Sequence, residues 1–182
     1  NQLVGLVERF VRERLVPNEK KLEEEAKLPE DILQEMKALG LFGLTIPEEY
    51  GGLGLTMEEE ILIAIALGRT SPAFRSIMGT NNGIGSAAIV FNGSEEQKQK
   101  YLPRYASGEW ISCFCLTEPE AGSDAASLKT NARREGDHYI LNGTKRYITN
   151  AIIADTFNVM ARTDPAIQGA RGISSFIVER DT

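Results

Sequence analysis

The spacing of apolar residues changes once along the chain, close to Gly108. Before that point apolar residues recur roughly every three or four positions, which places them on one face of an α-helix. After it they alternate with polar residues, as in half-buried strands. We therefore predict an α+β fold, with an all-helical domain over residues 1–110 and a strand-rich domain over residues 111–182.

In the first domain, the spacing predicts helices over residues 2–26, 29–39, 56–69, 72–91 and 94–106. Pro17 lacks a backbone N–H and is expected to break or kink the first helix, and three glycines weaken the helix over 72–91. Thr56 with Glu59, and Ser94 with Gln97, have the spacing of capping boxes. The helix that Thr56 begins is apolar nearly all round, so we expect it to be buried on several sides.

In the second domain, strands are predicted over residues 111–116, 128–134, 138–141, 144–149, 156–162 and 173–179. Asn142-Gly143 is a tight-turn signal between two of these strands. The only cysteines, Cys113 and Cys115, are two apart in a strand and so share one face. We expect two small buried residues there rather than a disulfide or a pair of metal ligands.

Composition narrows the range of functions. The 182 residues are 42% apolar and 25% charged, the profile of an ordinary globular protein. The formal net charge of −6 argues against nucleic acid as the main partner, because phosphate binding requires concentrated positive charge. The longest strongly apolar run, residues 61–67, is far shorter than the roughly 20 residues that a bilayer-spanning helix requires.

Two segments carry candidate chemistry. The first, LTEPEAGSD at Leu116–Asp124, follows a predicted strand. Gly122 lets a ligand approach the backbone and Ser123 offers a hydroxyl, so this loop is suited to a phosphate or pyrophosphate. Spacing alone favours a plainer interpretation, a turn in which Ser123 or Asp124 caps the next element.

The second segment is KRYITN at Lys145–Asn150. In a strand, Tyr147 and Thr149 share one face, where a planar heterocycle can stack near the ring and accept a hydrogen bond from the hydroxyl. A β-branched and aromatic strand face packed in a core is the commoner alternative.

Together, these segments resemble the acyl-CoA dehydrogenase family. In that family a strand runs into TEPxAGSD, and a later strand carries an aromatic residue followed by ITN. This chain has CLTEPEAGSD and RYITN in the same order and spacing. Weaker matches are IPEEYGGLG at residues 46–54, GSEEQKQKYLP at 93–103 and GDHYILNGTK at 136–145. The resemblance covers essentially the whole chain.

The resemblance implies FAD as cofactor and gives roles to individual residues. Phe114 and Leu116 would offer backbone groups to the flavin ring, Thr117 would lie near its pyrimidine end, and Thr149 would donate to N5. The implied cofactor-binding residues are Phe114, Leu116, Thr117, Gly122, Ser123, Tyr147, Ile148 and Thr149. Tyr147 would lie against the flavin face turned away from substrate. Many family members have Trp at this position, and the smaller ring still stacks.

The implied substrate is an acyl-CoA thioester. Ser123 would lie close to the acyl-CoA chain as well as to the FAD pyrophosphate. Arg171 lies in a Gly-rich loop that the resemblance places near the nucleotide part of CoA, although a free surface arginine is an equal alternative.

The expected activity is α,β-dehydrogenation of an acyl-CoA, with electrons passed to an electron-transfer flavoprotein. The family's catalytic base is a Glu of a C-terminal helical bundle absent from this chain. We therefore assign no catalytic residue, and expect a segment of a longer enzyme whose β-barrel-like second domain is truncated. An acyl-CoA oxidase or flavin monooxygenase on the same fold is an alternative. A non-catalytic homologue is another, which Thr117 and Thr149 argue against.

The resemblance further implies a role in fatty acid metabolism and a homo-oligomer, dimer or tetramer, in the full-length protein. It also implies a location in the bacterial cytoplasm or the mitochondrial matrix. No metal is predicted.

Overall fold

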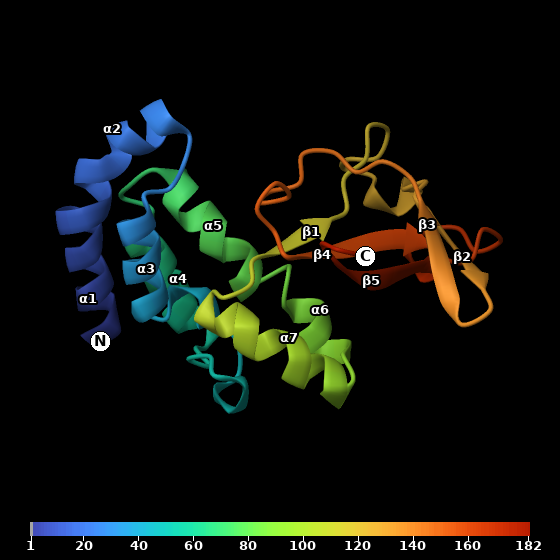
Figure 1. The fold of residues 1–182 in the computed structure, drawn as a ribbon, viewed down its shortest axis with the longest axis horizontal. Coiled ribbons are helices and arrows are strands. Elements are labelled where there is room, and N and C mark those ends of the chain that lie inside the picture. The colour runs from blue at the N-terminus through green and yellow to red at the C-terminus, as the bar shows by residue number, and fades with distance from the viewer. Residues whose placement is uncertain (1) are drawn as a thin grey trace. The chain divides into compact units, whose positions relative to one another are not determined.

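The computed structural model describes residues 2–182. The chain forms two compact units, the first ending at Ile111 and the second running from Ser112 to Thr182. The first unit is helical and the second is built from strands and loops (Figure 1). The predicted α+β class is therefore confirmed.

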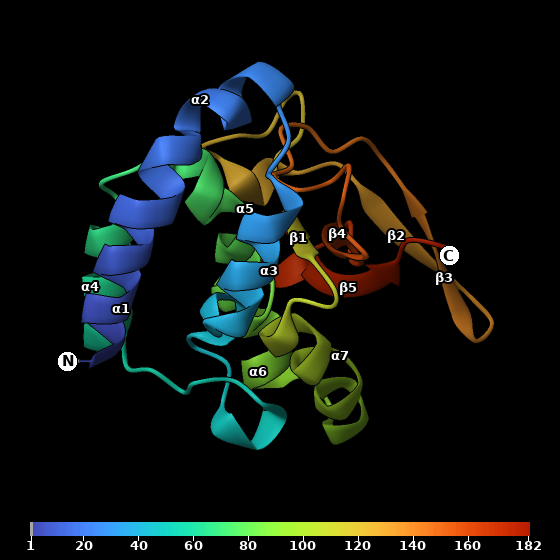
Figure 2. The ribbon, with the colours of Figure 1, turned by 60° about the vertical axis from the view of Figure 1, so that its left-hand side comes forward.

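The helical unit is built from short helices joined by tight turns. They are α1 (Gln2–Phe10), the π-helical turn η1 (Val11–Leu15), α2 (Val16–Glu25), α3 (Glu30–Ala38), α4 (Met57–Leu67), α5 (Pro72–Asn82), α6 (Ala87–Asn92) and α7 (Glu95–Ser107), with 3-10 turns η2 (Leu41–Gly43) and η3 (Glu48–Tyr50). Helix α1 packs against α4 (Figure 2). The apolar faces of the helices in this unit meet in one core, which includes Val7, Leu15, Ile32, Met36, Phe42 and Phe74.

The chain remains helical from Gln2 to Glu25, so Pro17 does not interrupt it. A π-helical turn ends at Leu15, two residues before the proline, and the Val16 N–H donates to Val11 O, five residues back. This longer hydrogen bond shifts the bonding register just ahead of a residue that cannot donate. The helix axis bends between α1 and α2 (Figure 1).

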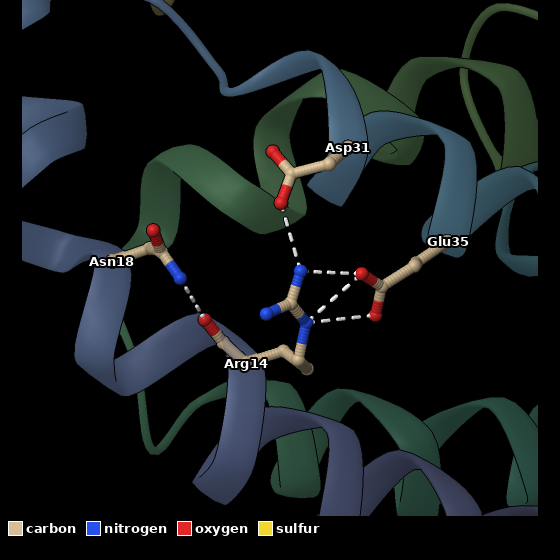
Figure 3. Close-up of polar contacts among 4 residues, drawn as sticks. All are labelled: Arg14, Asn18, Asp31 and Glu35. Atoms are coloured by element: carbon tan, nitrogen blue, oxygen red, sulfur yellow. Dashed lines mark hydrogen bonds and ion pairs between the residues drawn. The ribbon is translucent and has the colours of Figure 1, made fainter.

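Arg14, within the π turn, joins this long helix to α3. Its guanidinium donates to both carboxylate oxygens of Glu35, with Nε 2.9 Å from Oε1 and 3.0 Å from Oε2, and Nη2 lies 2.8 Å from Asp31 Oδ2 (Figure 3). Asn18 Nδ2 donates to the Arg14 carbonyl at 2.7 Å (Figure 3). The Glu35 hydrogen bonds, with Asp31, raise the pKa of Arg14 further above its ordinary value. A fork of this kind fixes direction as well as distance.

Both predicted capping boxes are present, at the starts of α4 and α7. The predicted helix over 72–91 is instead interrupted at Gly83–Gly85 and forms α5 and α6. The prediction that α4 is buried on several sides is also wrong, as judged from residues 2–182. Only Ile63, Ala66 and Leu67 are buried, while the remaining large apolar side chains of α4 are exposed, namely Met57, Ile61, Leu62 and Ile65.

The second unit is an open mixed sheet rather than a closed barrel. Its strands are β1 (Ser112–Cys115), β2 (Asn131–Glu135), β3 (His138–Asn142), β4 (Thr156–Arg162) and β5 (Ile173–Glu179). Strand β4 pairs in parallel with β1 and antiparallel with β5, and it meets β2 at Arg162 opposite Asn131. Strands β2 and β3 form an antiparallel hairpin. Cys113 and Cys115 are free and buried, as predicted, and pack with Ala154.

The strand predicted over 144–149 does not form. Tyr147 and Asn150 have φ of 57° and 67°, in the left-handed region, which no extended strand contains. Asn142-Gly143 is therefore not a hairpin turn, and the β2–β3 hairpin reverses at Gly136-Asp137 instead. Gly143 meets a different requirement, because a Cβ at this position would collide with Thr130.

Candidate functional site

The LTEPEAGSD segment leaves β1 and folds back on itself. Glu118 N–H donates to Ala121 O at 3.0 Å, and Ala121 N–H donates to Glu118 O at 3.3 Å. This closed turn leaves Gly122 and Ser123 exposed beyond it. Phe114, Leu116 and Thr117 are half-buried along β1 and just after it.

Glu118 is the most strongly held side chain of this turn. Only 6% of its side chain is exposed. Its carboxylate accepts from Lys129 N at 2.6 Å, from Thr130 N at 2.9 Å and from Lys145 Nζ at 2.8 Å. Burial, the largest single influence, raises the pKa of this carboxyl, but the hydrogen bonds outweigh burial and lower the pKa to about 2. Glu118 is therefore a structural carboxylate that stays ionised.

The KRYITN segment lies directly beside this turn. Arg146 N–H donates to Thr117 O at 2.9 Å. Lys145 Nζ donates to Leu116 O at 3.0 Å as well as to Glu118. The structure thus brings together the two segments that sequence motifs singled out, although 29 positions separate Lys145 from Leu116.

The arrangement within KRYITN differs from the predicted strand. Tyr147 is 80% exposed, and the Arg146 guanidinium lies over its ring at 4.6 Å from the centroid. Ile148 points the other way and packs against Cys113 and Cys115. Thr149 is exposed. A left-handed turn, rather than strand alternation, therefore presents the ring.

Arg180 secures the end of this segment. Its guanidinium donates to three carbonyls, with Nε 2.7 Å from Ala154 O, and Nη2 2.9 Å from Ile152 O and 3.3 Å from Ala151 O. Sequence reasoning missed Arg180, Lys145 and the carboxylate of Glu118. A charged residue that satisfies buried or turn carbonyls has the same local signal as a solvated one, so the sequence held no mark of these roles.

Arg171 is not brought to the two segments. It is exposed in the 3-10 turn η5 (Ala170–Gly172), and among residues 2–182 it has no hydrogen bond or ion pair with either segment. A pocket of about 970 Å³ lies in the same unit, next to the end of LTEPEAGSD. Its walls include Asp124, Ser127, Tyr139, Arg162 and Ile167.

No helix within residues 2–182 is long and apolar enough to cross a membrane. The same residues contain no cluster of three or more His, Cys, Asp or Glu side chains able to hold a metal ion.

Comparison with known proteins decides the family. The family model for the acyl-CoA dehydrogenase N-terminal domain matches residues 1–109, and that for the middle domain matches residues 113–182. The chain belongs to the acyl-CoA dehydrogenase family. The resemblance carried by TEPxAGSD and ITN is therefore confirmed.

Similar proteins extend well beyond this chain. An acyl-CoA dehydrogenase of Bacillus subtilis is 40% identical over 97% of the chain and 46% of its own length. The mitochondrial isovaleryl-CoA dehydrogenase of Pongo abelii is 40% identical over 98% of the chain and 43% of its own length. The chain thus spans about half the length of the curated relatives it matches.

Solved structures agree with this assignment. A glutaryl-CoA dehydrogenase of Mycobacterium smegmatis in complex with FADH2 has a TM-score of 0.88 at 40% identity, covering all of this chain and 45% of that one. An acyl-CoA dehydrogenase of Bacillus anthracis complexed with FAD has a TM-score of 0.84 at 41% identity, covering 99% of this chain and 30% of that one.

Proposed function

We propose that the protein containing this chain is a flavin-dependent acyl-CoA dehydrogenase that oxidises the α,β-bond of an acyl-CoA thioester. The observation that carries the proposal is the joining of LTEPEAGSD to KRYITN through Lys145 and Arg146. Family membership makes this activity the leading one, and relatives of the family have been solved with FAD and FADH2 bound.

The residues present fit a flavin. Within residues 2–182, β1 has a strand partner on one side only, and an edge strand can offer backbone groups to the hydrogen-bonding rim of a planar ring. Tyr147 supplies an exposed aromatic ring, and Thr149 supplies an exposed hydroxyl two residues later. FAD, when bound, supplies the acceptor for the substrate's hydride.

The role proposed for each residue is the one that the family resemblance implies. Backbone groups of Phe114 and Leu116, with the Thr117 hydroxyl, hold the ring edge. The Tyr147 ring supports the flavin from one side, and Thr149 donates to N5. Ile148 contributes through its backbone, because its side chain packs against the Cys113 and Cys115 cluster. Gly122 and Ser123 receive the pyrophosphate, since both are exposed just beyond a closed turn. Ser123 also contacts the acyl-CoA, and Arg171 meets its phosphates from an exposed turn.

Proton abstraction next to the thioester requires a carboxylate base, and Glu118 does not suit that task. A base must be free to receive a proton near neutral pH. Glu118 is buried, accepts three hydrogen bonds and has a pKa of about 2. We assign the base to a residue outside LTEPEAGSD and KRYITN.

The wider context is proposed on the same basis. Electrons pass to an electron-transfer flavoprotein in fatty acid metabolism. The full-length protein is a homodimer or homotetramer in the bacterial cytoplasm or the mitochondrial matrix. Oxygen as the acceptor, as in an oxidase or monooxygenase, is the alternative.

The test uses the full-length protein reconstituted with FAD. We expect a flavin absorption band, and bleaching of that band when acyl-CoA is added without oxygen. Slow reoxidation in air but fast reoxidation by an electron-transfer flavoprotein supports the dehydrogenase, whereas fast reoxidation in air supports the oxidase. A protein that takes up no FAD at all would refute the proposal and favour a non-catalytic homologue.

A further inference from the structure

The side chain of Lys145 is buried between the two flavin-facing segments. Only 11% of it is exposed. Its ammonium donates to the carbonyl of Leu116 at 3.0 Å and to Glu118 Oε1 at 2.8 Å. A buried ammonium is stable only when its charge and its donors are matched, and both conditions are met here.

Glu118, in turn, is anchored to a third stretch of chain. Its second oxygen accepts from the N–H of Lys129 at 2.6 Å, and its first also accepts from that of Thr130 at 2.9 Å. Lys145 and Glu118 therefore tie the end of β1, the loop that leads into β2, and the KRYITN segment into one network.

The network sets the spacing between two candidate flavin contacts. Arg146 N–H donates to Thr117 O, so the backbone of KRYITN is held in register with the peptide after Leu116. Tyr147 and Thr149 follow within three residues and have no strand to hold them. Lys145 and Arg146 thus hold the start of this turn relative to Thr117, while Arg180 holds the carbonyls that follow it.

Lys145 also acts on the peptide bond itself. Its ammonium donates to the carbonyl of the peptide that joins Leu116 to Thr117. A charged donor on a carbonyl polarises the amide, and the N–H of the same peptide becomes a stronger donor. That N–H belongs to Thr117, at the proposed ring edge.

We propose that Lys145, neutralised by Glu118, is a positioning residue that holds the Leu116–Thr117 peptide and the Tyr147–Thr149 turn at the spacing that FAD requires. The proposal rests on the proposed function. Lys145 acts through the peptide and the turn, and it touches neither substrate nor the reacting atoms in this role.

The opposite charges of Lys145 and Glu118 predict opposite shifts in the midpoint potential of the bound flavin when each residue is replaced. Lys145→Met leaves the Glu118 carboxylate without its cation, and added negative charge near a flavin disfavours its reduction. Glu118→Gln leaves the Lys145 cation unneutralised, and added positive charge favours reduction. If the pair had a purely structural role, both variants would bind FAD more weakly, but their midpoint potentials would not shift in opposite directions.

The experiment compares wild type, Lys145→Met, Lys145→Arg, Glu118→Gln and the double variant in the full-length protein. FAD affinity of the apoprotein is measured by flavin fluorescence, and the midpoint potential of the bound flavin by dye-linked titration. We expect Lys145→Met to weaken FAD binding about tenfold or more, the order expected for a lost charge-assisted hydrogen bond, and to lower the potential. Glu118→Gln raises the potential, and Lys145→Arg, which keeps the charge, restores part of the affinity.

Two further measurements complete the design. Hydrogen exchange of the apoprotein is expected to become faster at the amide of Arg146 in Lys145→Met, without any flavin present. Lys129→Met is the matched control, because that side chain is 73% exposed and, within residues 2–182, its hydrogen bond and ion pair go to Glu120. We expect this control to leave affinity, potential and exchange unchanged.

The double variant keeps the test decisive if Lys145→Met does not fold, because removing both charges costs far less than breaking a buried pair. Weakened FAD binding with a potential near wild type supports the proposal. Wild-type affinity in the double variant or in Lys145→Met overturns it, as does a potential that moves in the same direction in both single variants. A wild-type protein with no affinity for FAD overturns the proposed function, and this inference with it.

Discussion

Glu118 makes the free energy of unfolding of the second unit depend on pH, and a single substitution at this residue can measure that dependence. Its folded-state pKa is about 2, against an ordinary 4.5. A carboxyl whose pKa falls on folding stabilises the fold above its unfolded value, and that contribution disappears as pH falls through the folded value. The relevant window therefore runs from about pH 4.5 down to about pH 2.

The size of the effect follows from the same difference. The lowering of the Glu118 pKa corresponds to about 3 kcal/mol of unfolding free energy at pH 7. Roughly half or more of this is lost by pH 3, because the unfolded carboxyl takes up its proton there while the folded one resists. The side chain is nearly fully buried, so solvent screening removes little of this energy.

The assay is urea denaturation of wild type and Glu118→Gln at a series of pH values between 3 and 8. We expect Gln to destabilise the second unit by about 3 kcal/mol at pH 7, since it keeps the shape but loses the charge and one acceptor. The difference between the two proteins should shrink steadily below about pH 4.5. Glu120→Gln is the matched control, because the Glu120 side chain is exposed and, within residues 2–182, its ion pair is with Lys129.

Two results would refute this reasoning. One is a difference between wild type and Glu118→Gln that stays constant down to pH 3. The other is an equal effect of Glu118→Gln and Glu120→Gln, which would mean that the hydrogen bonds from Lys129, Thr130 and Lys145 do not stabilise the charged form.

Three further substitutions test other contacts. Gly143→Ala should destabilise the second unit by about 2 kcal/mol in denaturant titrations, because a Cβ would collide with Thr130. Gly122→Ala is the control, because open space surrounds Gly122. An equal loss of stability in the two variants would contradict the prediction. Arg180→Met should speed amide hydrogen exchange at Ile153 and Ala154 by about tenfold, since three carbonyls lose their donor. Unchanged exchange would mean that Arg180 does not hold the end of the KRYITN segment. Thr56→Ala should cost about 1 kcal/mol in thermal unfolding, because α4 loses its N-cap. An unchanged melting temperature would contradict this prediction.

Features that depend on residues only a few positions apart were predicted correctly. Both capping boxes formed, because each requires only a side chain and a backbone N–H three residues apart. Strands β4 and β5 occupy the predicted ranges, and Cys113 with Cys115 shares one buried face, since alternation in a strand is a local property. The family was also readable, because TEPxAGSD and ITN are contiguous motifs.

Predictions failed where distant residues decide the conformation. Tyr147 follows the alternation expected of a strand, but Arg146 bonds to Thr117 and Arg180 holds the carbonyls after Asn150, so the backbone turns into the left-handed region instead. The strand predicted from Leu128 begins only at Asn131, because the N–H groups of Lys129 and Thr130 are committed to Glu118. None of these three partners, Thr117, Arg180 and Glu118, is near in sequence to the residues that it holds.

The sequence by itself determined the class of fold, the capping of its helices and the two motifs that mark a flavoprotein family. Only the tertiary structure showed that those motifs meet, and that Lys145 and Glu118 hold them together. The physical reason is that a buried ion pair has no local signature. A lysine and a glutamate look like solvated surface residues until the fold removes water from both and leaves each as the other's partner.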